Sequence, residues 1–160
     1  MKKIIGCVLV TIVVLGLIGC SKQYSSSSVN PKQEYAKTFS LDFATESTNI
    51  AKESIDLYNQ AIADKVPDMD TFKSKYKGFS NVATKNADEK DLHDFIMTFG
   101  NDYTLLSSSV SILMVEQNLR DSGMESKEKY DATLKEYQLK KVEHMKQIKI
   151  DLDNIMKYYQ

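Results

Sequence analysis

Histidine and carboxylate side chains are the first candidates for chemistry in this chain, because together they can bind metals or transfer protons. The only histidines are His93 and His144, and Asp91 and Asp94 flank the first of them. If the helices that carry the histidines turn back on each other near Gly123, the two imidazoles are separated along the helix axis by about nine residues, or ~14 Å. One ion cannot bind both, so we expect no metal site and no cofactor. We expect His93 on the surface and His144 partly buried with a hydrogen-bond partner.

The serines between residues 107 and 111 are the second candidates, because a serine hydroxyl is a nucleophile when a base and an oxyanion hole lie beside it. Four of these five positions are serine, and they lie in a helical stretch between Leu106 and Ile112. Amide groups in the middle of a helix are already hydrogen-bonded and cannot stabilise an oxyanion. We therefore expect these hydroxyls to bond back to the preceding helical turn, and we expect no catalytic residue.

Cys20 lies where an apolar segment ends and a polar segment begins. Lys2 and Lys3 precede an almost wholly apolar stretch over residues 4–18, and Gly19 precedes the cysteine. This order is typical of a secretory signal. As a helix, these 15 residues would reach only ~22 Å, whereas the hydrocarbon core of a bilayer is ~30 Å thick. The segment is therefore too short for a membrane-spanning helix.

The residues Leu17-Ile18-Gly19-Cys20 resemble the lipobox of bacterial lipoproteins, in which aliphatic and small residues precede an obligatory cysteine. The resemblance covers only the first 20 residues. It implies that a diacylglyceryl group is attached to the Cys20 sulfur and that cleavage before Cys20 makes this residue the new N-terminus. Two acyl chains hold a protein stably in a bilayer where one would dissociate. We therefore expect a removed signal peptide over residues 1–19 and a membrane contact through the lipid on Cys20.

Composition limits the chemistry of the chain after such a cleavage. The remaining 141 residues contain one cysteine, which the lipid would occupy. No internal disulfide and no cysteine-based zinc site are then available. Their formal charge is −3, which offers no electrostatic basis for binding nucleic acid.

Residues 20–32 are polar and include four consecutive serines, Ser25 to Ser28, before Pro31. A segment of this composition buries too little apolar area to order itself. We therefore expect a lipidated, flexible tether over residues 20–32, followed by one domain over residues 33–160.

Apolar residues after residue 32 recur at spacings of three and four, which is the helical period. We expect four helices, at about 31–64, from Pro67 to about Val82, at about 88–122, and from Ser126 to near the end of the chain. Asn86 followed by Glu89 predicts capping at the start of the third helix. Gly123 predicts a left-handed cap at its end.

The third helix has the cleanest apolar stripe, with alternating spacings of four and three residues: Leu92, Ile96, Phe99, Tyr103, Leu106, Val110, Leu113 and Gln117. This alternation is typical of a helical bundle or coiled coil. Short loops make neighbouring helices antiparallel. The predicted fold is therefore all-α: an up-down antiparallel bundle of three long helices and one shorter helix.

Two surfaces are candidates for binding. Asp88, Asp91, Asp94 and Asp102 predict an acidic outer face on the third helix. Acidic residues near a helix N-terminus are favourable in themselves, so this face is either simply solvated or a docking surface for a basic partner. Tyr158 and Tyr159 are the best candidates for an exposed aromatic pair, of the kind that binds glycans.

These features favour a lipid-anchored binding or interference module that docks an unknown envelope protein. A structural spacer or assembly factor for cell-wall machinery is the alternative, and an enzyme is the third hypothesis. We expect the protein on the extracytoplasmic face of the cell membrane of a Gram-positive bacterium, or at the outer membrane of a Gram-negative one. Beyond the first 20 residues, the sequence resembles no family.

Overall fold

The computed structural model of the chain describes residues 24–63 and 69–160, and the side chains of residues 24–63 and 72–160. The elements are a 3₁₀ helix, η1 (Ser26–Ser28), and the helices α2 (Gln33–Ala36), α3 (Leu41–Ile62), α4 (Met69–Phe79), α5 (Ala87–Asp121) and α6 (Lys127–Ile155). The described ranges contain no β-strand, only an isolated antiparallel bridge between Pro31 and Tyr159. The all-α prediction is confirmed. None of the helices in these ranges is both long enough and apolar enough to cross a bilayer.

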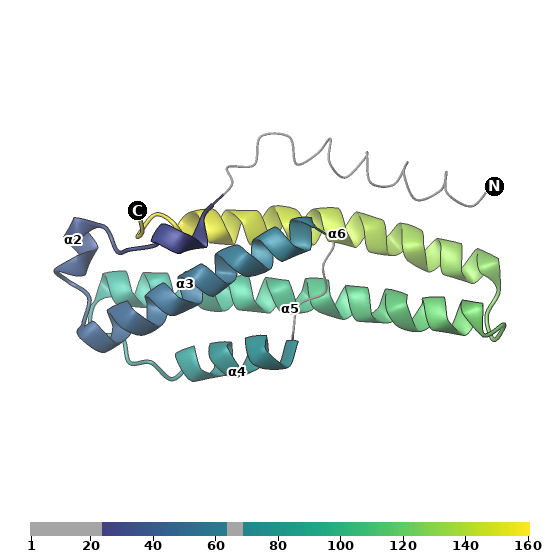
Figure 1. Cartoon of the computed structure of the whole chain (residues 1–160), viewed down its shortest axis with the longest axis horizontal. Helices are drawn as coiled ribbons and strands as arrows, with labels where there is room; N and C mark the ends of the chain where they lie inside the picture. Colours follow the sequence, from purple (N-terminus) through teal and green to yellow (C-terminus); the bar gives the residue numbers. More distant parts are fainter. Residues whose placement is uncertain (1–23, 64–68) are drawn as a thin grey trace.

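Helices α3 to α6 run up, down, up and down, and α5 and α6 make the most extensive contact (Figure 1). α5 has 35 residues and α6 has 29, whereas α3 has 22 and α4 has 11. At about 1.5 Å per residue, α5 is therefore ~52 Å long and α3 only ~33 Å. α3 and α4 cover the half of the α5–α6 pair that contains the start of α5, and the pair continues alone beyond them (Figure 1). The antiparallel bundle of three longer helices and one shorter helix is as predicted, and α3 is the shortest of the three longer ones.

The predicted helix over residues 31–64 is interrupted: residues 33–36 form the separate helix α2, and the chain turns between α2 and the start of α3 at Leu41. The turn is built around Glu89, whose side chain is fully buried. Its carboxylate accepts hydrogen bonds from the backbone N–H groups of Ser40 and Lys85. Burial alone would raise the pKa of Glu89, but these two backbone bonds, together with a bond from the Ser40 side chain and the charge of Lys85, outweigh it and lower the pKa. Asn86 adds a further bond from its Nδ2 to the carbonyl of Thr38, at 3.0 Å.

Residues 24–32 pack against the bundle, so the prediction of a flexible tether extending to residue 32 is wrong for this part of the tether. Val29 is buried, and the backbone of Asn30 exchanges two hydrogen bonds with Gln160, at 3.2 and 2.9 Å. Lys32 donates to the carbonyl of Tyr158, and the Tyr24 hydroxyl donates to Asp153. The backbone bonds of Asn30 and Lys32 hold this segment on the bundle, although its polar side chains bury little apolar area. The predicted signal peptide and Cys20 lie outside the described residues.

The predicted ends of the long helices are confirmed. The Asn86 side chain accepts from the N–H of Glu89 at 2.9 Å, and the Ser126 side chain accepts from Lys129. Gly123 has φ +75, and the N–H of Met124 donates to the carbonyl of Leu119. This is a Schellman cap, in which the glycine takes the left-handed conformation that other residues avoid. It allows α5 to turn directly into α6.

α4 packs on α5 at a point of very close approach. The Tyr76 ring lies over Gly100, so that a Cβ at position 100 would be 2.4 Å from a carbon of the ring. The Tyr76 hydroxyl hydrogen-bonds with Ser54 of α3 at 2.7 Å, which holds the ring in place. Tyr76 therefore joins three helices, and only glycine fits beneath it.

We predict that Gly100→Ala destabilises the fold by about 1–3 kcal/mol, because the added methyl group must displace the Tyr76 ring. Gly78→Ala is the matched control. Nothing lies within 4 Å of a Cβ at position 78, and alanine in a helix is favoured over glycine by about 0.5–1 kcal/mol. Thermal unfolding should therefore move in opposite directions for the two variants. Equal melting temperatures for Gly100→Ala and the wild type would contradict the close approach.

The stripe predicted on α5 is buried only as far as α3 and α4 extend. Its members from Leu92 to Leu106 are buried. Val110 and Leu113 are half-buried, and Gln117 is exposed. The periodicity is correct throughout, but beyond Leu106 α6 alone covers this stripe.

Candidate functional site

The first two turns of α5 carry the predicted acidic face. Asp91 and Asp94 are exposed there, and Asp88 is half-buried. Burial and then the charges of Asp91 and Asp88 raise the pKa of Tyr158, so these carboxylates lie close to the C-terminal residues. Three of the four predicted members therefore form a surface at the end of the bundle that also carries residues 30–32 and 158–160.

Asp102, the fourth predicted member, does not belong to this surface. It lies between α5 and α6, where its carboxyl group hydrogen-bonds with that of Asp151. Asp151 is buried and also accepts from Gln147 Nε2 at 3.1 Å. Burial, followed by the Asp102 bond and charge, raises the pKa of Asp151 to about 6. Below this pKa the two neighbouring carboxyl groups share a proton, and above it both carry a charge, which is unfavourable at that distance.

We predict that Asp151→Asn stabilises the protein at pH 7 by about 3 kcal/mol, since the pKa of Asp151 is raised from 3.8 to about 6 and one pKa unit corresponds to about 1.4 kcal/mol. A raised carboxyl pKa means that the folded state binds the proton more tightly than the unfolded state. The stability from this group is then complete below pH ~4 and is lost as the pH rises to ~6. The asparagine variant should lack this loss.

Thermal unfolding between pH 4 and pH 7 tests this prediction. Asp56→Asn is the control, because Asp56 is exposed on α3, and it should follow the wild-type curve. An Asp151→Asn protein that is less stable than wild type at pH 7 would contradict the shared proton.

The two histidines do not approach each other. The His93 ring stacks on Phe79 of α4, with 5.1 Å between centroids, and its Nδ1 lies 3.5 Å from Asp94 Oδ1. His93 is therefore half-buried beneath α4, and the prediction that it lies on the open surface is wrong. His144 is half-buried, as predicted. Across the described ranges, no group of three or more histidine, cysteine or acidic side chains is arranged to hold a metal ion.

The serine hydroxyls of α5 bond back to the helix, as predicted. Ser108 donates to the carbonyl of Thr104 at 2.9 Å, Ser109 to Leu105 at 3.1 Å, and Ser111 to Ser107 at 3.0 Å. Their protons are therefore engaged with the backbone.

Tyr158 and Tyr159 are buried, so the predicted exposed aromatic pair is wrong. The Tyr159 hydroxyl donates to Ser47 at 2.9 Å, and the Tyr158 ring packs against Tyr35. The extended pairing of residues 30–32 with residues 158–160 turns both tyrosines inward, and helical periodicity carries no signal for such pairing.

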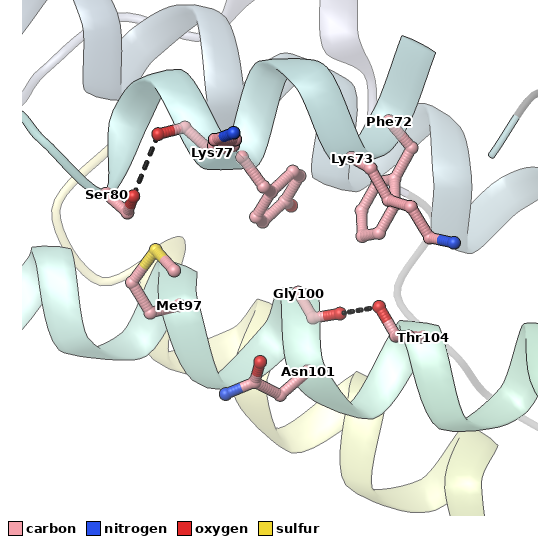
Figure 2. Close-up of a pocket in the computed structure, with 9 residues that line it drawn as sticks. Phe72, Lys73, Lys77, Ser80, Met97, Gly100, Asn101 and Thr104 are labelled. Carbon is pink, nitrogen blue, oxygen red and sulfur yellow. Dashed lines mark hydrogen bonds between the residues drawn. The ribbon is translucent and has the colours of Figure 1, made fainter. Parts of the chain in front are cut away.

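A hollow of about 140 Å³ lies between α4 and α5 (Figure 2). Phe72, Tyr76, Met97 and Gly100 form its apolar part, and Lys73 and Lys77 stand at its α4 edge. The hydroxyls of Ser80 and Thr104 donate to backbone carbonyls of their own helices, as the dashed lines show. The hollow thus offers apolar surface with a basic edge, which suits an aliphatic side chain better than a polar cofactor.

A second, shallower hollow of about 80 Å³ lies on the outer half of the α5–α6 pair. Ser109, Ile112 and Tyr137 are among the residues that line it. Sequence reasoning missed both hollows and the exposed apolar residues between them, because it assigned only one stripe to α5.

Comparisons of the chain with protein-family models, with curated proteins and with solved structures give no match.

Proposed function

We propose that this chain is an extracytoplasmic lipoprotein, anchored through Cys20, whose helical body is a binding or interference module for a protein of the cell envelope. The observation that carries the proposal is the packing of residues 24–32 on the bundle, immediately after the lipobox-like residues. Because Tyr24 already contacts the bundle, an anchor at Cys20 would be connected to the body by only four residue steps, at most ~14 Å.

A short connection would hold one end of the body next to the membrane. Tyr24 is bonded to Asp153 near the end of α6, so the C-terminal part of α6 would lie closest to the lipid. The acidic surface formed by Asp88, Asp91 and Asp94 lies at the same end. Confinement there would raise its effective concentration toward membrane partners.

The partner that suits this surface carries basic side chains. Asp91 and Asp94 are exposed, and among the residues whose side chains the structure describes, none from another helix forms an ion pair with either. Attraction between such exposed charges is screened by salt. The proposed docking is therefore electrostatic and weakens as ionic strength rises.

We predict that Cys20→Ala abolishes labelling by a palmitate analogue in growing cells, because the thiol is the proposed site of lipid attachment. The uncleaved precursor should accumulate in the membrane fraction, retained by residues 4–18. Cys7→Ala is the matched control and should be labelled like wild type. Equal labelling of Cys20→Ala and wild type would overturn the proposed anchor.

We predict that Asp91→Lys combined with Asp94→Lys lowers the yield of the protein's cross-links to its envelope partner several-fold in intact cells. Mass spectrometry of the cross-linked species identifies the partner and measures the yield. Asp56→Lys, on the exposed face of α3, adds the same kind of charge elsewhere and should preserve the yield. A yield that does not change with the charge reversal would exclude this docking face.

The alternative, a structural spacer or assembly factor for cell-wall machinery, is favoured by a different observation. The outer half of the α5–α6 pair extends as a two-helix arm beyond α3 and α4 (Figure 1). If the arm rather than the acidic face contacts the partner, cross-links should map to residues 110–140.

A further inference from the structure

α5 carries a second stripe of mainly apolar residues, on a face that the other described helices leave largely exposed. Its members are spaced four, three, four, three and four residues apart, as in a coiled coil: Asn101, Leu105, Ser108, Ile112, Val115 and Leu119. We refer to these six residues as the outer stripe. Leu105, Ile112 and Val115 are 52%, 59% and 57% exposed. No charged residue lies between Asp102 and Glu116, so this stretch resembles a helix interface rather than a solvated face.

The outer stripe is complementary to itself when two copies run antiparallel. Leu105 and Val115 are equally far from residue 110 in the sequence, as are Ser108 and Ile112, and Asn101 and Leu119. A two-fold axis at the level of residue 110 therefore places Leu105 of one copy opposite Val115 of the other. It also places the small Ser108 opposite the large Ile112, which lets the helices interdigitate.

Burial of this stripe leaves no serine donor unsatisfied. The Ser108 hydroxyl already donates to the Thr104 carbonyl, and the neighbouring Ser109 and Ser111 hydroxyls are engaged in the same way. Unsatisfied buried donors are the main cost of bringing polar residues into an interface. The serines therefore act as small residues that permit a close approach.

Charge favours the antiparallel arrangement over the parallel one. α4 carries three lysines and one aspartate, a net charge of +2. The end of the α5–α6 pair, residues 116–131, carries five acidic and three basic side chains, a net charge of −2. In the antiparallel arrangement each α4 lies beside the acidic end of the other copy, whereas a parallel arrangement would place like charges together.

The hollow beside α4 fits the same arrangement. Met97, Asn101 and Thr104 border it on α5, and Lys73 and Lys77 border it on α4 (Figure 2). The residue opposite Asn101 in the antiparallel pairing is Leu119 of the second copy. Its side chain would enter the apolar part of the hollow. Glu116 of the same copy, which pairs with Lys129 of its own chain at 3.8 Å, would come near the lysines.

We propose that the outer stripe is the interface of an antiparallel homodimer, in which α5 of one copy packs against α5 of the other. This goes beyond the proposed function and does not depend on the lipid anchor. If the anchor is also present, the two Tyr24 residues lie toward opposite ends of the dimer, so its long axis lies along the membrane.

Paired cysteines test the register of the two helices. The full-length chain, with Cys7→Ser and Cys20→Ser, is purified in detergent and receives Leu105→Cys and Val115→Cys together. Mild oxidation should yield a disulfide-linked dimer, because positions 105 and 115 face each other across the axis. Leu105→Cys alone should remain monomeric on a non-reducing gel, since ten residues of helix place its two copies ~15 Å apart along the axis.

Two further comparisons test the face and the charges. In the paired-cysteine chain, Ile112→Lys should reduce the linked dimer at least tenfold. Leu139→Lys should not, because Leu139 is as exposed but lies on α6. Reversing Lys73 and Lys77 to glutamate should weaken linking several-fold, and simultaneous reversal of Glu116 and Asp121 to lysine should restore it.

Absence of linked dimer from the paired-cysteine chain would overturn the proposal. Efficient linking through Leu105→Cys alone would overturn the antiparallel arrangement and indicate a parallel pair. Circular dichroism of each variant identifies any loss of linking that results from unfolding. In that case Ser108→Asp, a change at another exposed position of the stripe, replaces the unfolded variant, and undiminished linking by it would also overturn the proposal.

Discussion

The unequal length of the helices is the constraint on which the rest of the structure depends. α5 and α6 are long enough to pair along about 44 Å, the length of the 29-residue α6, but α3 and α4 have only 22 and 11 residues with which to cover them. Where all four helices are present, the core is closed and rich in aromatic rings, including Phe43, Phe99 and Tyr103. Where only two remain, apolar residues such as Ile112 stay in contact with solvent. Apolar residues of α5 are thus exposed where α3 and α4 no longer pack on the α5–α6 pair.

The boundaries of that cover depend on a small number of polar groups. Glu89 has no place in an apolar stripe, yet it is completely buried, because it binds two backbone N–H groups that would otherwise lack partners. It thereby ends the extended helix that the apolar residues before Ser40 would permit. Helical periodicity predicts which face of a helix is buried. It does not predict that a carboxylate from another helix, here Glu89, bonds to the backbone and ends the helix.

Local signals could therefore be predicted from the sequence and long-range ones could not. The caps at Asn86, Gly123 and Ser126 act over three to five residues, and each was identifiable from residue type and spacing alone. The inward position of Tyr159 depends on pairing with Pro31 at the other end of the chain, and the position of Asp102 depends on Asp151 in the next helix. In each of these cases the residue that decides the outcome is remote in sequence, so a pattern search along one helix misses it.

The pairing of residues 30–32 with residues 158–160 also affects the order in which the chain can fold. Contacts between α5 and α6 are local around Gly123, so the hairpin can form as soon as both helices exist. The segment from Tyr24 to Lys32 also touches α3, but its long-range hydrogen-bond partners lie almost 130 residues further along the chain, as in the bond between Tyr24 and Asp153. A chain that emerges with its N-terminus first therefore holds this segment unpaired until nearly all of α6 has followed. Residues 24–32 are therefore among the last that can complete their native hydrogen bonds, and the bundle can close fully only when the C-terminal residues have emerged.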